Sequence, residues 1–226
     1  MKYYFTALFL LFCLANVYGQ LPYRIKADIT IKEKTADDSI SLTKGKVYFD
    51  MYSKQVVYSL RMPSRQTIVM RDTTTLYYEG TKLVNSTKSF VLVDFSIFNM
   101  ALKNNVADFG LRDSPFTLEK VEKEDSLVIS TWTLYHPKKK TLISKILLAK
   151  KAQKLNGMIV YASDNLLASK QFYEDYTYVK GVWFPQHVTQ YIYTKKGETL
   201  QYYEYSNIEI NKPGEDEIYF FGTRNK

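Results

Sequence analysis

Strict alternation of apolar and polar residues near the start of the chain constrains the fold more than any other sequence feature. Between Tyr23 and Lys32 every second residue is apolar, and the residues in between are charged or hydroxylated. Because successive side chains of a β-strand point to opposite faces, this pattern predicts a strand with one buried face. The same period recurs at residues 47–51 and 56–62, so we expect antiparallel hairpins of one sheet.

Further strands are predicted along most of the remaining chain. Pro63 ends one strand because proline has no N–H for the ladder. The later strands are expected near residues 68–70 and 76–78, and then over 116–122, 127–135, 142–149, 157–163, 168–178, 182–194 and 199–210. About 11 strands are more than a flat open sheet usually holds. The predicted fold is therefore mainly β, a strongly curved antiparallel half-barrel.

One segment between the strands, Asp94 to Asn104, predicts a helix that is apolar on nearly every side. Ser96, Asn99 and Lys103 form a single narrow polar stripe, and Asp94 is a suitable N-cap. Such a helix cannot rest on a sheet with most of its surface in water. It requires an apolar concavity around it, or a lipid.

The first 19 residues have the pattern of a secretory signal peptide. Lys2 supplies a positive charge, residues 5–15 are apolar but too few to span a bilayer, and Gly19 offers a cleavage point. The alternative is a retained membrane anchor. After cleavage we expect one domain over residues 20–211 and a tail over 212–226, which either adds an edge strand or docks on the body. The only cysteine, Cys13, would leave with the signal.

Charge and residue usage limit the classes of function. Removal of Lys2 leaves 30 basic residues against 23 acidic ones, a net charge of +7, which favours anionic surfaces such as lipid headgroups. Nucleic acid is not an expected partner of an exported protein. Only His136 and His187 could act as bases near neutral pH, and no nucleophile, metal-binding or phosphate-binding motif is present. We therefore expect no enzyme activity, no catalytic residues, no cofactor and no metal site.

The order of local patterns resembles that of the periplasmic outer-membrane lipoprotein carriers, the LolA/LolB-like family. The main match is Leu60 to Tyr78 (LRMPSRQTIVMRDTTTLYY). The other matching stretches follow in the family's order and are LYHPK at 134–138, the strand at 143–149, LNGMIV at 155–160, Asp164-Asn165 and GVWFPQHV at 181–188. Together they extend over most of the mature chain.

The resemblance implies a half-barrel whose apolar concave face holds acyl chains, with the helix at 94–104 as a lid or plug. The residues expected to line this cavity are Ile25, Ile29, Val47, Phe49, Met51, Tyr58, Leu60, Met62, Ile68 and Met70, with Phe95, Phe98 and Leu102 from the lid. It also implies a monomeric carrier in the periplasm that takes lipid or acylated lipoprotein from donor to acceptor membrane proteins, as part of outer-membrane biogenesis.

Two family features have no counterpart here. The carriers begin with a helix before the first strand, whereas only Gln20-Leu21-Pro22 would precede Tyr23. They also carry an Arg-Pro pair on the second strand, where this chain has residues 51–54 (MYSK), so the arginine that gates cargo in the family has no match. The alternative function is a non-catalytic envelope module that binds a protein partner, with the concave face filled by its own side chains.

Overall fold

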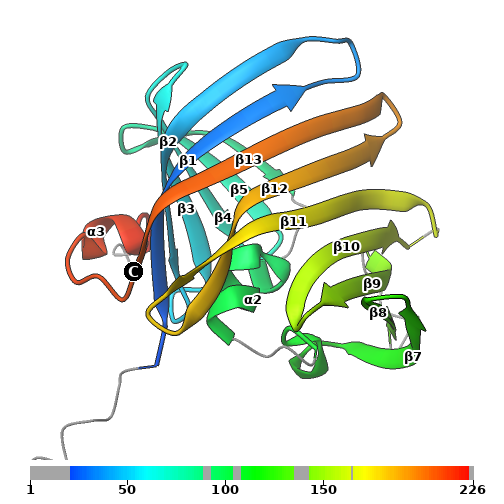
Figure 1. Cartoon of the computed structure of the whole chain (residues 1–226). Helices are drawn as coiled ribbons and strands as arrows, with labels where there is room; N and C mark the ends of the chain where they lie inside the picture. Colours follow the sequence, from blue (N-terminus) through cyan, green and yellow to red (C-terminus); the bar gives the residue numbers. More distant parts are fainter. Residues whose placement is uncertain (1–20, 89–92, 104–107, 135–142, 164, 224–226) are drawn as a thin grey trace, which may run out of the picture.

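The computed structural model describes residues 21–88, 93–103, 108–134, 143–163 and 165–223. These residues form one antiparallel sheet of 13 strands that curves around a short helix (Figure 1). The strands are β1 (Arg24–Lys34), β2 (Ile40–Asp50), β3 (Gln55–Met62), β4 (Gln66–Arg71), β5 (Thr74–Glu79), β6 (Lys82–Lys88), β7 (Phe116–Glu124), β8 (Leu127–Leu134), β9 (Ile143–Lys151), β10 (Lys154–Ala162), β11 (Leu167–Val179), β12 (Val182–Thr194) and β13 (Gly197–Ile210).

The sheet consists of two meanders joined through the first and last strands. Its order is β6-β5-β4-β3-β2-β1-β13-β12-β11-β10-β9-β8-β7, and β1 pairs with β13 so that Ile29 lies opposite Tyr205. Strands β6 and β7 are the two edges, so the sheet stays open. The predicted fold class, a strongly curved antiparallel half-barrel with a helix, is confirmed.

The predicted alternation places apolar side chains in rows across the strands. Ile25 lies opposite Phe49, Phe49 opposite Val56, and Val56 opposite Met70. Residues directly opposite each other in antiparallel strands point to the same face. This row belongs to the large core cluster that contains the helix residues, so it lies on the concave face.

One glycine allows the sheet to coil tightly between β2 and β3. Gly45 stands at a register shift, and a Cβ atom added to it would lie 2.3 Å from the carbonyl oxygen of Ser59. No side chain fits at that distance. A glycine is therefore required for this close approach.

The helix on the concave face is shorter than predicted. A 3₁₀ turn, η1 (Val93–Phe95), precedes α2 (Ile97–Lys103), and a second 3₁₀ turn, η2 (Leu111–Asp113), leads to β7. The predicted start at Asp94 is wrong, because the side chain of Ser96 caps α2 by accepting a hydrogen bond from the Asn99 amide at 3.3 Å. Asn104 lies outside the described residues.

The tail docks on the convex face of the sheet, and its residues as far as Thr223 form no strand. Helix α3 (Asp216–Tyr219) packs against β2 and β3, and the ring of Tyr219 meets that of Tyr48 edge to face, with centroids 5.3 Å apart. The buried Gln55 donates a hydrogen bond of 2.7 Å to the Tyr219 carbonyl. Arg24 lies 4.1 Å above the Tyr219 ring and pairs with both Asp50 and Asp216. The tail thus packs on the outer face, whereas α2 and the turns η1 and η2 pack in the core on the concave face (Figure 1).

Candidate functional site

Phe98 of α2 is the centre of the contact between the helix and the concave face. Its ring stacks on Phe49 of β2 and Phe184 of β12, with centroid distances of 6.2 and 5.6 Å, and meets Tyr205 of β13 edge to face at 5.7 Å. Only 2 % of Phe98 is exposed. The Phe98 side chain therefore contacts strands of both meanders.

The remainder of α2 is buried nearly all round. Ile97, Met100 and Leu102 all lie in the core, and Phe95 of the preceding turn η1 meets Phe116 of β7 edge to face at 5.8 Å. The polar residue Asn99 is also buried, and its side chain is satisfied locally by donating 2.8 Å to the Asp94 carbonyl. The helix binds the sheet through apolar contact, while its polar stripe is satisfied locally at Ser96 and Asn99 and by Asp113 of η2, 3.6 Å from the Lys103 ammonium.

The structure brings most of the predicted cavity residues together around this helix. Buried in the same core cluster are Ile25, Ile29, Val47, Phe49, Phe95, Phe98 and Leu102, and half-buried against it are Met51, Tyr58 and Met70. Leu60 and Ile68 are half-buried outside that cluster. Met62 is 37 % exposed at the end of β3, so it does not join the others.

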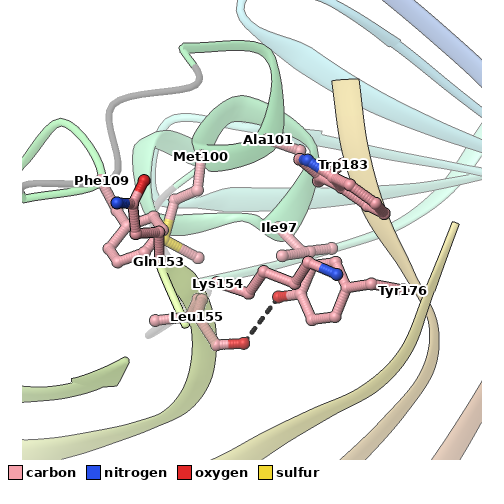
Figure 2. Close-up of a pocket in the computed structure, with 9 residues that line it drawn as sticks. All are labelled: Ile97, Met100, Ala101, Phe109, Gln153, Lys154, Leu155, Tyr176 and Trp183. Atoms are coloured by element: carbon pink, nitrogen blue, oxygen red, sulfur yellow. Dashed lines mark hydrogen bonds between the residues drawn. The ribbon is translucent and has the colours of Figure 1, made fainter. Parts of the chain in front are cut away.

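With α2 in place, little free volume remains beside it. A pocket of about 30 Å³ lies between α2 and strands β10 to β12, which is room for about two water molecules (Figure 2). Ile97, Met100 and Trp183 contribute apolar surface, and the Tyr176 hydroxyl donates 2.7 Å to the Leu155 carbonyl. Lys154 holds its ammonium 3.6 Å from the centre of the Trp183 ring. This pocket is too small for an acyl chain.

A larger hollow, about 360 Å³, lies at the turns after β3 and β5. Its lining includes Arg61, Arg65 and Leu60, together with hydroxyl and amide groups of the same turns. It is open and mixed in polarity, so it differs in kind from the apolar concavity.

Sequence reasoning missed a row of polar side chains on the concave face. Gln171 of β11 lies opposite Gln190 of β12, Gln190 opposite Gln201 of β13, and Gln201 opposite Glu33 of β1. Gln171 and Gln190 are each only 8 % exposed. Alternating polar residues normally indicate the solvent face, and nothing in the local pattern marks these as inward.

Tyrosines separate this polar row from α2. Tyr203 stacks on Tyr205 with ring centroids 6.2 Å apart, and its hydroxyl donates 2.6 Å to Gln201 Oε1. Tyr173 donates 2.6 Å to Gln171 Oε1 in the same way. Burial raises the pKa of Tyr173, Tyr203 and Tyr205. These phenols therefore stay neutral, and those of Tyr173 and Tyr203 donate hydrogen bonds.

In the part of the chain that the structure describes, no other cluster of side chains suggests catalysis. His187 lies on the other face of β12, where its Nδ1 is 2.6 Å from Asp175 Oδ2 and its ring stacks on Tyr202. His136 lies outside the described residues. Among those that are described, no group of three or more His, Cys, Asp or Glu side chains could hold a metal ion. Within the same ranges, no helix has the length and apolar character needed to cross a membrane.

Solved structures provide the informative comparisons. A LolA superfamily protein from Nitrosomonas europaea is 13 % identical with a TM-score of 0.61, over 87 % of this chain and 90 % of that one. A putative outer membrane lipoprotein-sorting protein domain from Vibrio parahaemolyticus is 9 % identical with a TM-score of 0.58, over 87 % and 89 %. This chain has a LolA-like fold. No protein-family profile and no curated protein sequence matches it.

The LolA-like fold extends to a third protein, a DUF1329 family protein from Desulfovibrio piger. It is 12 % identical with a TM-score of 0.58, over 93 % of each chain. The expected resemblance to the LolA/LolB-like carriers is thus confirmed at the level of the fold. Identity this low carries over no residue roles, so the site rests on the contacts described above.

Proposed function

We propose that this protein is a non-enzymatic carrier that binds lipid or lipoprotein acyl chains on its concave face, in exchange for α2, and transfers them between membranes. The observation that supports this most is the burial of α2 within a LolA-like half-barrel. An apolar helix only seven residues long has little stability of its own. The helix stays on the concave face because its apolar side chains are buried there, and an acyl chain can cover the same apolar surface instead.

The free energies of the two occupants are similar. Five buried side chains, Phe95, Ile97, Phe98, Met100 and Leu102, contribute about 1.5–3 kcal/mol each, or about 8–15 kcal/mol together. A saturated chain of roughly 14 methylenes contributes about 11 kcal/mol at about 0.8 kcal/mol for each. One acyl chain therefore only breaks even with the plug. We expect the guest to carry two or more chains, as diacyl lipids and acylated proteins do.

The cellular setting belongs to the same proposal. Residues 1–19 would act as a signal peptide cleaved after Gly19, and residues 20–211 would act in the periplasm as one carrier domain, followed by the tail at 212–226. The carrier would work as a monomer between donor and acceptor membrane proteins of the envelope, in outer-membrane biogenesis.

The filled interior favours a second candidate function. If α2 never leaves, the concavity is an ordinary core, and the protein is an envelope module that binds a protein partner through its surface. The pocket of about 30 Å³ beside the helix is what such a module would have. The two candidates differ in whether α2 moves when lipid is present.

Trp183 provides a direct reporter of that movement. It is 42 % exposed and lines the pocket beside α2, whereas the other tryptophan, Trp132, is buried on β8. In a Trp132→Phe variant, titration with a soluble diacyl lipid should change the emission of Trp183 and saturate. Mass spectrometry of the native protein should also find co-purified lipid.

A matched variant distinguishes insertion from adsorption to the surface. Ile40→Asp changes an exposed apolar residue at the start of β2, nine residues along the strand from Phe49, which contacts Phe98 of α2. It should leave the titration unchanged. Absence of both co-purified lipid and a saturable Trp183 response would overturn the carrier proposal in favour of the filled module.

A further inference from the structure

The polar row on the concave face has side-chain amide donors that no described residue uses. Gln171 and Gln201 use their carbonyl oxygens to accept from Tyr173 and Tyr203. Gln201 also donates its amide to Glu33. Gln190, in the middle of the row, makes no side-chain hydrogen bond to any described residue although it is 92 % buried. Neither polar atom of its amide is among the fully enclosed ones that lack a partner, so the amide still contacts solvent and is open to a ligand.

The row lies at a defined position relative to the plug. Gln201 is four residues along β13 from Tyr205, whose ring contacts Phe98 of α2. At about 3.4 Å per residue, the row is about 14 Å from that contact along the strand. Between them lie tyrosine and aliphatic side chains, including Val188 and Ile31. A guest whose tail replaced α2 would bring the other end of that tail to the glutamines.

We propose that Gln190, flanked by Gln171 and Gln201, binds the ester or amide carbonyls that join acyl chains to a lipid headgroup. This inference rests on the proposed carrier function and names the part of the guest that the concave face recognises. The side-chain amide nitrogens (Nε2) of Gln190 and Gln171 are left to donate, and a carbonyl oxygen is the acceptor that matches them.

The charge at the row favours a neutral group over an anion. Glu33 contributes a carboxylate to the row, and its two neighbours across the sheet, Gln201 on β13 and Ser41 on β2, are uncharged. The lysines on the adjacent positions, Lys32 and Lys34, alternate to the opposite face of β1. A phosphate or a free carboxylate at this level would lie near Glu33 without a matching cation, whereas an uncharged ester would not be repelled.

The test compares two lipids that differ only in the carbonyls. Didecanoylglycerol carries two esters, and its diether analogue, didecylglycerol, has the same chains and headgroup without carbonyl oxygens. Displacement of a fluorescent apolar dye from the wild-type protein should show about tenfold tighter binding of the diester, a difference equal to about 1.4 kcal/mol. Didecanoyl phosphatidic acid should bind less tightly than didecanoylglycerol.

Gln190→Leu should abolish the preference. The substitution removes the amide but keeps an apolar side chain of similar size, so the diester and the diether should then bind equally, both near the wild-type affinity for the diether. Thr189→Val is the matched control, because Thr189 is the next residue on β12 and points to the other face. It should retain the tenfold preference.

The possible results separate this inference from the carrier function. Equal binding of diester and diether to the wild-type protein, or tighter binding of phosphatidic acid, would overturn the carbonyl site and leave the carrier proposal standing. Failure of every lipid to displace the dye would overturn both. The wild-type comparison decides the matter even if the Leu variant does not fold.

Discussion

Replacement of Phe98 by alanine should weaken folding and strengthen lipid binding in the same protein. Phe98 is almost fully buried against Phe49, Phe184 and Tyr205, and a buried Phe→Ala change typically costs about 3–5 kcal/mol. That cost falls on the state in which α2 fills the concavity. A state in which a guest has displaced α2 does not include these contacts and is not destabilised.

The two effects have the same origin, and so their sizes are linked. If the closed state loses about 3 kcal/mol relative to the open one, the open fraction rises by about 100-fold, and the apparent Kd for a diacyl lipid falls by up to the same factor. Chemical denaturation gives the change in the free energy of unfolding, and the dye displacement assay gives the change in Kd.

Val57→Ala is the control for stability alone. Val57 is fully buried in the separate cluster on the convex face, with Tyr48, Val69 and Tyr219. Its truncation should cost about 2 kcal/mol, from two methyl groups at about 0.8 kcal/mol each plus a small cavity, and leave the Kd unchanged. If Phe98→Ala lowered stability while lipid affinity stayed the same or fell, α2 would be ordinary core and the exchange mechanism would be refuted.

Three further changes test the outer face. The Tyr219 hydroxyl is buried with no partner among the described residues, so Tyr219→Phe should keep or raise the melting temperature, whereas Tyr219→Ala should cost about 3–5 kcal/mol by denaturation. Arg24→Met leaves the buried Asp50 carboxylate without its cation and should cost about 3–5 kcal/mol in the same assay. Hydrogen bonds from Asn207 and Lys46 lower the pKa of Asp28 below 3.8, so its contribution to stability is present above that pH and is lost as the pH falls through the lowered pKa. The melting-temperature difference between wild type and Asp28→Asn should therefore shrink between pH 5 and pH 3.

The residues of the concave face could be predicted because a strand with one buried face needs an apolar side chain at every second position. The residues at 25, 29, 47, 49 and 56 stand at every second position of their strands, and the antiparallel register places them on one face because opposed residues share a face. The burial of the helix followed from its narrow polar stripe in the same way. In both cases the sequence pattern and the tertiary contact have the same geometric cause.

The features that could not be predicted depend on contacts distant in sequence. Pairing of β1 with β13 joins the two ends of the domain, and no local pattern specifies it. Strand β6 was missed because every residue in it is exposed, so it has no alternation of burial. The helix was placed too early because Asp94 and Ser96 are both good caps, and only the 3₁₀ turn at η1 decides between them.

A filled concavity is what a carrier at rest requires, so the filling alone does not decide between the two candidate functions. An empty apolar concavity would expose a large hydrophobic patch and favour aggregation.

The deciding quantity is the free energy needed to move α2 out of the concavity. For a carrier it must be smaller than the free energy of global unfolding, and native-state hydrogen exchange measures both. The α2 amides that are hydrogen-bonded within the helix, such as that of Met100, should exchange through a local opening. The free energy of that opening should be several kcal/mol lower than the free energy needed for exchange of the β1 and β13 amides. Saturation with a diacyl lipid should protect β1 and β13 further while leaving Met100 as exchangeable or more so. If Met100 exchanged only with global unfolding, α2 would be fixed core, and the surface of the sheet would be the place to search for function.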